Sequence, residues 1–184
     1  MKLWGAAMAV VVCSWAADAS ADVSGWTHVG GGALGWKGGP DQDLTASAIM
    51  SIDAGLGTTP RAPFIFGGYF RVMPVFGEGV DLALLLRFAT SSFQTDLFGF
   101  AFDAGAYQRF WGTESTGFIG QVVLGMPLGF QLAGIGMGGS GEAFGFGGTL
   151  GMDFIRLMVD RQHLLEWWPN PRPSDNMYGA LSLP

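Results

Sequence analysis

The chain has 184 residues, of which 49% are hydrophobic and only 13% are charged, with 31 glycines and a net charge of −6. A typical soluble domain carries about a quarter charged residues, so part of this surface is expected to meet something other than water. Nucleic acid is excluded as a partner because phosphates call for a basic patch, and the sequence has none.

The first 21 residues have the order of residue types found in a cleavable secretory signal peptide. Lys2 supplies the positive charge, and residues 3–17 form an apolar stretch shorter than the roughly 20 residues of a spanning helix. Ala19 and Ala21 place small side chains where a signal peptidase reads them. We therefore expect cleavage after Ala21, export, and a single domain over residues 22–184; a retained membrane anchor is the weaker alternative.

Cysteine and metal chemistry are not expected in the exported chain. Cys13 is the only cysteine and lies within the signal peptide, which leaves no thiol for a disulfide. His28 and His163 do not have a recurring metal-ligand spacing with any carboxylates. We expect no metal and no cofactor.

Alternation of apolar with small or polar residues is the main structural signal after residue 22. Between Leu44 and Leu56 every even position is apolar, whereas the odd positions include Ser51 and Asp53. This period of two predicts half-buried strands. In chain order, eight strands are predicted at Trp26–Lys37, Leu44–Leu56, Phe64–Val75, Gly79–Thr90, Asp96–Phe110, Thr116–Met126, Gly129–Met137 and Glu142–Phe154, each long enough to cross the apolar layer of a membrane.

The segment from Ser115 to Gly141 has no charge and is the best candidate for a membrane-spanning helix. Nine of the 25 residues from Gly117 to Gly141 are glycine, and Pro127 lies near the middle. Glycine costs about 1 kcal/mol and proline about 3 kcal/mol in a helix interior. Two strands joined by a turn at residues 126–129 therefore fit better.

The second face of the predicted strands is mainly glycine, alanine and serine with an occasional charge. Exposed faces normally carry far more Lys and Glu, so this face is interpreted as the crowded interior of a barrel; a solvated sheet face is the alternative. Six charged residues share it, and we expect them to pair across neighbouring strands, since unpaired buried charges are very costly. They are Asp53, Arg71, Asp81, Arg87, Asp103 and Arg109.

The last thirty residues leave the strand count open. The alternation changes phase near Ile155, which is consistent with a bulge or with a short helix through His163 and Trp168. Residues 177–183 have the pattern of a closing strand. The barrel is therefore predicted with eight strands, or with ten as the alternative.

From Trp26 to Pro184 the chain resembles the eight-stranded OmpA and OmpX type of small outer-membrane β-barrel of Gram-negative bacteria. The resemblance rests on a signal peptide followed by repeated amphipathic strands. It implies an all-β, antiparallel, up-and-down transmembrane barrel in the outer membrane, in contact with lipid and inserted by the assembly machinery. Pro184 in place of a terminal aromatic residue, and a mean hydropathy of +0.33, depart from that family.

Aromatic residues near the predicted strand ends are expected to form the girdles that such barrels place at the two membrane interfaces. They are Trp26, Trp36, Trp111, Trp167, Trp168 and Tyr178.

No catalytic constellation is recognised in the sequence. Gly134, Gly136 and Gly139 match G-x-G-x-x-G, but this motif binds a dinucleotide only where a helix follows the strand. His28 has no serine two residues on, and His163 is followed by Leu164, Leu165 and Glu166, so neither resembles the sites of the lipid-modifying outer-membrane enzymes. A lone histidine at a membrane interface is more often a girdle or loop residue. Serines 24, 140 and 174 have no evident base. We expect no enzyme activity.

Three functional classes follow from these patterns. The first is a structural or surface protein of the outer membrane with an interior filled by side chains, because eight strands leave little room for a pore. The second is a narrow, porin-like channel or small-ligand carrier. The third is a soluble periplasmic lipid-binding barrel.

Overall fold

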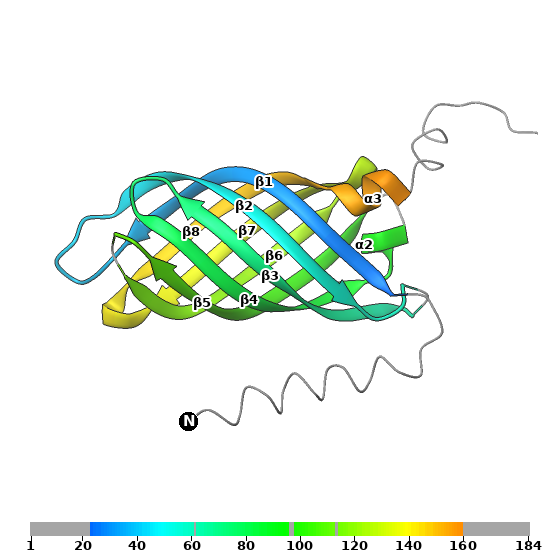
Figure 1. Ribbon diagram of the computed structural model, residues 1–184, viewed down its shortest axis with the longest axis horizontal. Coiled ribbons are helices and arrows are strands. Elements are labelled where there is room, and N and C mark those ends of the chain that lie inside the picture. The colour runs from blue at the N-terminus through cyan, green and yellow to red at the C-terminus, as the bar shows by residue number, and fades with distance from the viewer. Residues whose placement is uncertain (1–22, 61, 96–97, 113, 160–184) are drawn as a thin grey trace, which may run out of the picture.

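A closed barrel of eight antiparallel strands is the architecture of the computed structural model, which describes residues 23–60, 62–95, 98–112 and 114–159 (Figure 1). Each strand pairs with its neighbours in sequence, and the first strand also pairs with the last. The strands are β1 Ser24–Lys37, β2 Thr45–Gly57, β3 Phe64–Val75, β4 Gly79–Thr90, β5 Gly99–Phe110, β6 Ser115–Gly125, β7 Phe130–Gly139 and β8 Phe144–Asp153.

The predicted all-β, up-and-down fold with eight strands is therefore confirmed. Because β1 bonds directly to β8, the wall has no place for two further strands, and the ten-strand alternative is wrong. The segment 177–183 that prompted it lies outside the described residues.

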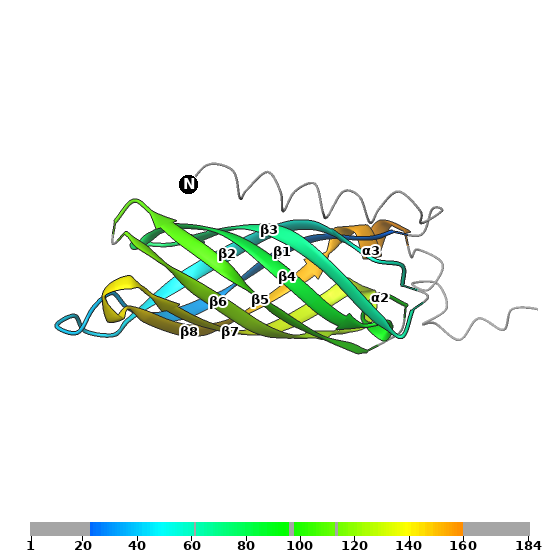
Figure 2. The same cartoon turned by 90° about the horizontal axis from the view of Figure 1, so that it is seen from below.

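The two ends of the barrel differ in their connections (Figures 1 and 2). At one end, here called the capped end, lie the start of β1 and three short helical elements: α2 Ser92–Thr95, the 3-10 turn η1 Pro127–Gly129 and α3 Phe154–Val159. At the other, the loop end, lie the connections that follow β1, β3, β5 and β7, the last with the 3-10 turn η2 Ser140–Glu142. Gly77, with a φ of +90°, forms the tight turn between β3 and β4.

Short helices adjoin two strands at the capped end, α2 before β5 and α3 after β8. The strand expected from Asp96 begins at Gly99, because residues 92–95 form α2; Asp96 itself lies outside the described residues. At the change of phase near Ile155, β8 gives way to the helix α3 and not to a bulge. Asp153 caps this helix, since its Oδ1 accepts hydrogen bonds from the backbone N–H groups of Ile155 and Arg156, at 3.0 and 3.3 Å.

Large apolar side chains cover the outside of the barrel. Leu86 is 73% exposed and Phe118 is 78% exposed, and many other outward positions in the strands carry Phe, Leu or Val. The inside holds two apolar clusters, one toward each end. The cluster of the capped end is Trp26, Ile65, Ala89, Phe93, Ala101, Val123 and Ala133, and that of the loop end includes Leu34, Trp36, Ile49, Met73, Val75, Tyr107, Ile119, Ile135 and Met137.

Candidate functional site

Three Asp–Arg pairs lie inside the barrel, and one of them, Asp81–Arg109, lies beside Trp36 of the loop-end cluster. The strand register places Asp53 opposite Arg71, Asp81 opposite Arg109, and Arg87 opposite Asp103. Directly opposed residues on antiparallel strands point to the same face, so each acid meets a base from the neighbouring strand. All six predicted interior charges are at most 3% exposed.

Each pair is joined by two hydrogen bonds to the two carboxylate oxygens. Arg71 Nε and Nη2 lie 2.8 and 2.7 Å from Asp53, and Arg87 Nε and Nη2 lie 2.8 and 2.9 Å from Asp103. The corresponding distances from Arg109 to Asp81 are 2.6 and 2.8 Å. This bidentate geometry is the strongest form of the arginine–carboxylate contact. It fixes the register as well, since a one-residue slip would turn these charges toward the apolar outer face.

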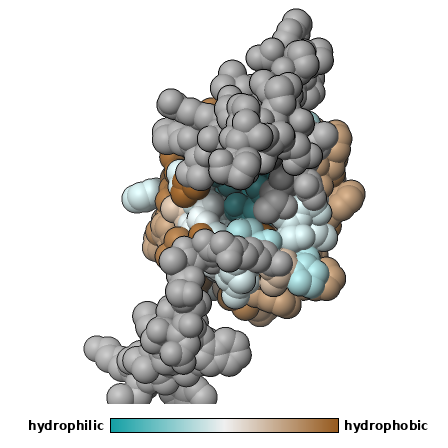
Figure 3. Space-filling view, turned by 90° about the vertical axis from the view of Figure 1, so that its right-hand side faces the viewer, coloured by the Kyte–Doolittle hydropathy of each residue, from teal (hydrophilic) through white to brown (hydrophobic). Residues whose placement is uncertain are grey.

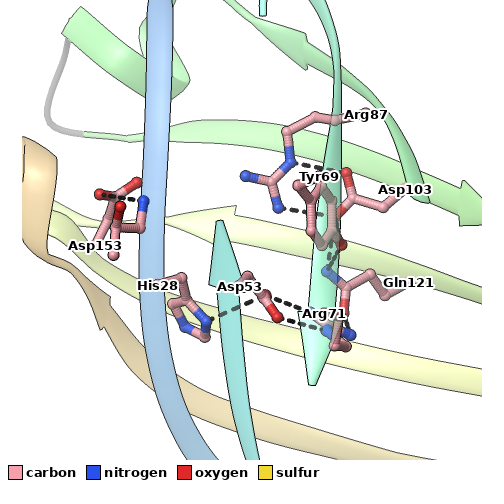
Figure 4. A network of polar contacts seen from close by, with 9 residues as sticks. His28, Asp53, Tyr69, Arg71, Arg87, Asp103, Gln121 and Asp153 are labelled. Carbon is pink, nitrogen blue, oxygen red and sulfur yellow. Dashed lines mark hydrogen bonds and ion pairs between the residues drawn. The ribbon is translucent and has the colours of Figure 1, made fainter. Parts of the chain in front are cut away.

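Gln121 of β6 connects two of the pairs (Figure 4). Its Oε1 accepts from Arg71 Nη1 at 2.8 Å, and its Nε2 donates to Asp103 Oδ2 at 2.6 Å and to the Tyr69 hydroxyl at 2.9 Å. The Tyr69 hydroxyl in turn donates to Asp103 at 3.0 Å. Alternation places Tyr69 and Gln121 on the interior face, but nothing in the sequence indicated that they connect two of the charged pairs.

Trp26 and Trp36 correct the prediction of an aromatic girdle. Both are 1% exposed and lie inside the barrel, where they cover arginines. The Arg109 guanidinium carbon lies 3.8 Å from the centroid of the Trp36 ring, and that of Arg87 lies 5.1 Å from the Trp26 ring. The Trp26 ring fits inside the barrel because residue 67 is a glycine. A Cβ at this position would collide with the ring.

The other predicted girdle residues have different outcomes. Trp111 is 72% exposed at the loop end, directly after β5. Trp167, Trp168 and Tyr178 lie outside the described residues. The girdle thus stays a prediction for these four residues.

His28 also lies inside the barrel, which contradicts its interpretation as a girdle or loop residue. Its side chain is 6% exposed, and its Nδ1 lies 3.4 Å from Asp53 Oδ2 (Figure 4). The register explains the contact, since His28 stands directly opposite Asp53. Asp53 therefore has a base on each side, Arg71 from β3 and His28 from β1.

The capped end is closed from within by α2 and braced by α3. Phe93 of α2 is 1% exposed, and its ring lies 5.0 Å from the Arg87 guanidinium carbon. Gln94 Nε2 donates to the Gly25 carbonyl at 3.3 Å, and Arg156 Nη1 donates to the Phe93 carbonyl at 3.0 Å. Viewed from this end, hydrophilic residues gather at the centre and hydrophobic ones on the outer wall (Figure 3).

The described residues do not form a metal cluster, a nucleotide-binding motif or a membrane-spanning helix. Their His, Cys, Asp and Glu side chains form no group of three or more that could hold a metal ion. Gly134, Gly136 and Gly139 lie within β7, and the 3-10 turn η2 follows, which lacks the helix that a dinucleotide phosphate requires. Among the same residues, no helix combines the length and apolar character needed to cross a bilayer.

Comparison with protein-family models, with curated proteins and with solved structures finds no match to this chain. Each Asp–Arg pair is closed by its own two hydrogen bonds, and Gln121 and Tyr69 connect two of the pairs.

Proposed function

We propose that this chain is a non-enzymatic β-barrel of the Gram-negative outer membrane, with its outer wall in contact with lipid and a structural or surface role. The observation that carries the proposal is the distribution of charge. Every charged residue of the eight described strands is buried inside except Lys37, which is the last residue of β1. A wall that faces water normally carries many charged side chains. On a wall that faces hydrocarbon, each charged side chain lowers the stability of the barrel.

The loop end carries the remaining acidic residues of the described chain. Each of its four connections has at least one, and most are exposed. They are Asp41, Asp43, Glu78, Glu114 and Glu142. Among the described residues, an apolar wall with charge in its interior and acidic side chains at the loop end supports a barrel that crosses a bilayer with this rim in water.

The length and composition of the wall support the same placement. The strands have 10 to 14 residues, and about 9–11 tilted residues cross the hydrocarbon core. Exposed side chains such as Leu84, Phe100 and Phe118 continue around the barrel, and monomeric soluble proteins rarely expose a contiguous apolar surface of this kind.

The filled lumen favours a structural or surface role over transport. The three Asp–Arg pairs and the two apolar clusters occupy it. Eight-stranded barrels have interiors just wide enough for side chains. The proposed partners are membrane lipid and the insertion machinery, with no nucleic acid and no cofactor.

Refolding into lipid vesicles loaded with a self-quenching dye tests insertion and conduction together. We expect the protein to float with the vesicles in a density gradient, to migrate faster on gels before heating than after, and to release no dye. Dye release would support a channel instead. A folded protein that remains in the aqueous fraction would support the soluble, lipid-binding alternative.

A further inference from the structure

The apolar cluster at the capped end differs from the loop-end cluster in where its members come from. Apart from Ala143, every member of the loop-end cluster lies on a strand. At the capped end the ring of Phe93 belongs to α2, and three of the six strand positions carry only a methyl group. These positions are Ala89, Ala101 and Ala133. A residue from outside the barrel wall therefore completes this cluster.

A pair of glycines in the wall makes room for Phe93. Gly99 of β5 stands opposite Gly125 of β6, and both are buried on the inner face. A Cβ on Gly99 would collide with the Phe93 backbone, and a Cβ on Gly125 would lie 3.0 Å from the Phe93 ring. The guanidinium carbon of Arg87 lies 5.0 Å from the centroid of the same ring. Phe93 thus lies between no bulky strand side chains of β5 and β6 at this level, and beside the arginine that binds Asp103.

Two side-chain hydrogen bonds join α2 to elements that are distant in the sequence. Gln94 Nε2 donates to the Gly25 carbonyl of β1 at 3.3 Å, and Arg156 Nη1 of α3 donates to the Phe93 carbonyl at 3.0 Å. The second bond supplies a partner that α2 cannot provide, because the last carbonyls of a helix have none within it. A helix of four residues is not stable by itself, so its position depends on such contacts.

The helix α3 is itself attached to the place where the first and last strands meet. Asp153 Oδ1, at the end of β8, accepts from the backbone N–H of Thr27 in β1 at 3.4 Å and caps α3. Figures 1 and 2 show α2 and α3 at this same end of the barrel. Hydrogen bonds therefore run from β1 and β8 to α3, and from α3 through Arg156 to α2.

We propose that α2 is a plug that can leave the lumen without disrupting the wall, and that Arg156 is the latch that holds it in place. The eight strands close the barrel by pairing with one another, so the wall does not need α2. Without Arg156 the Phe93 carbonyl is buried without its donor, which favours a local opening in which this carbonyl meets water. The proposal concerns the lumen alone and does not rest on the location of the barrel in a membrane.

Cysteine labelling tests the plug, because residues 22–184 contain no cysteine. Ala101→Cys reports on the capped end and Ala83→Cys on the loop end, where the two alanines are 3% and 2% exposed. In the full exported chain, refolded in detergent, both should react slowly with a charged, water-soluble methanethiosulfonate. Arg156→Met, which removes the donor and keeps a long side chain, should speed the reaction at Ala101→Cys about tenfold and leave Ala83→Cys unchanged.

Two further variants complete the test. Phe93→Ala removes the ring of the plug and should make Ala101→Cys reactive even with Arg156 present. Gln94→Ala removes the bond to Gly25 and should act in the same direction as Arg156→Met, whose place it takes if that variant does not fold. Far-ultraviolet circular dichroism identifies the folded variants.

Three results would overturn the proposal. Protection of Ala101→Cys in the Phe93→Ala variant would show that the strands close this end without α2. An unchanged rate at Ala101→Cys after loss of the latch would show that Arg156 does not hold the plug. An equal rise at Ala101→Cys and Ala83→Cys would indicate a general loosening of the barrel and not the release of α2.

Discussion

Arg87→Leu is expected to destabilise the barrel by about 3–5 kcal/mol, because it leaves the Asp103 carboxylate buried without its arginine. Asp103 is 0% exposed and receives two of its hydrogen bonds from Arg87. The Tyr69 hydroxyl and Gln121 would still donate to it, but neither carries a charge. The change is measured as a shift in the urea midpoint of the protein refolded in detergent or lipid.

The double variant Arg87→Leu/Asp103→Leu is the matched control. Removing both charges takes away the unpaired ion, so the double variant should be more stable than Arg87→Leu alone. An unchanged midpoint for Arg87→Leu would contradict the interior pairing. A further outcome is a double variant that loses as much stability as Arg87→Leu and Asp103→Leu lose together. That result would indicate that packing of Arg87 against Trp26 and Phe93 matters more than its charge.

Leu84→Arg has the second largest expected effect and tests the surroundings of the outer wall. Leu84 lies in the middle of β4 and is 69% exposed. An arginine at the midplane of a bilayer costs a barrel about 2–4 kcal/mol, whereas a substitution on a water-facing surface usually changes stability by within about 0.5 kcal/mol. We expect the larger loss when unfolding is measured in lipid vesicles.

Gln108→Arg controls for the arginine itself. Gln108 is exposed on β5, two residues before the loop end of that strand, where the cost in a bilayer falls to about 0–1 kcal/mol. A large loss at Leu84 with a small one at Gln108 is the depth dependence that a spanning barrel requires. Equal and small effects at both positions would indicate that the wall faces water.

Much of the fold could be predicted because one physical pattern repeats along the chain. Alternation gave the bounds of β3 and β4 as they occur, and it assigned all six paired charges to the inner face. The opposite signs on neighbouring strands predicted pairing, and the register brings Asp53 to Arg71 and Asp103 to Arg87. Such pairs are predictable because an unpaired interior charge is too costly to persist.

The strand β1 shows where the pattern fails. Its bulky residues, Trp26, Leu34 and Trp36, face inward, while its outward positions before Lys37 are small or β-branched. Hydrophobicity therefore does not distinguish the inner face of β1 from its outer face. The position of Trp26 and Trp36 near strand ends instead suggests the membrane interface. Their true position depends on glycines of other strands, such as Gly67, which only the folded register brings beside them.

Fractionation of the cells that express the chain tests the proposed outer-membrane location most directly. We expect the protein in the outer-membrane fraction, resistant to extraction with alkaline carbonate and with a gel mobility that changes on heating. Recovery of the folded protein in the soluble periplasmic fraction would contradict the claim.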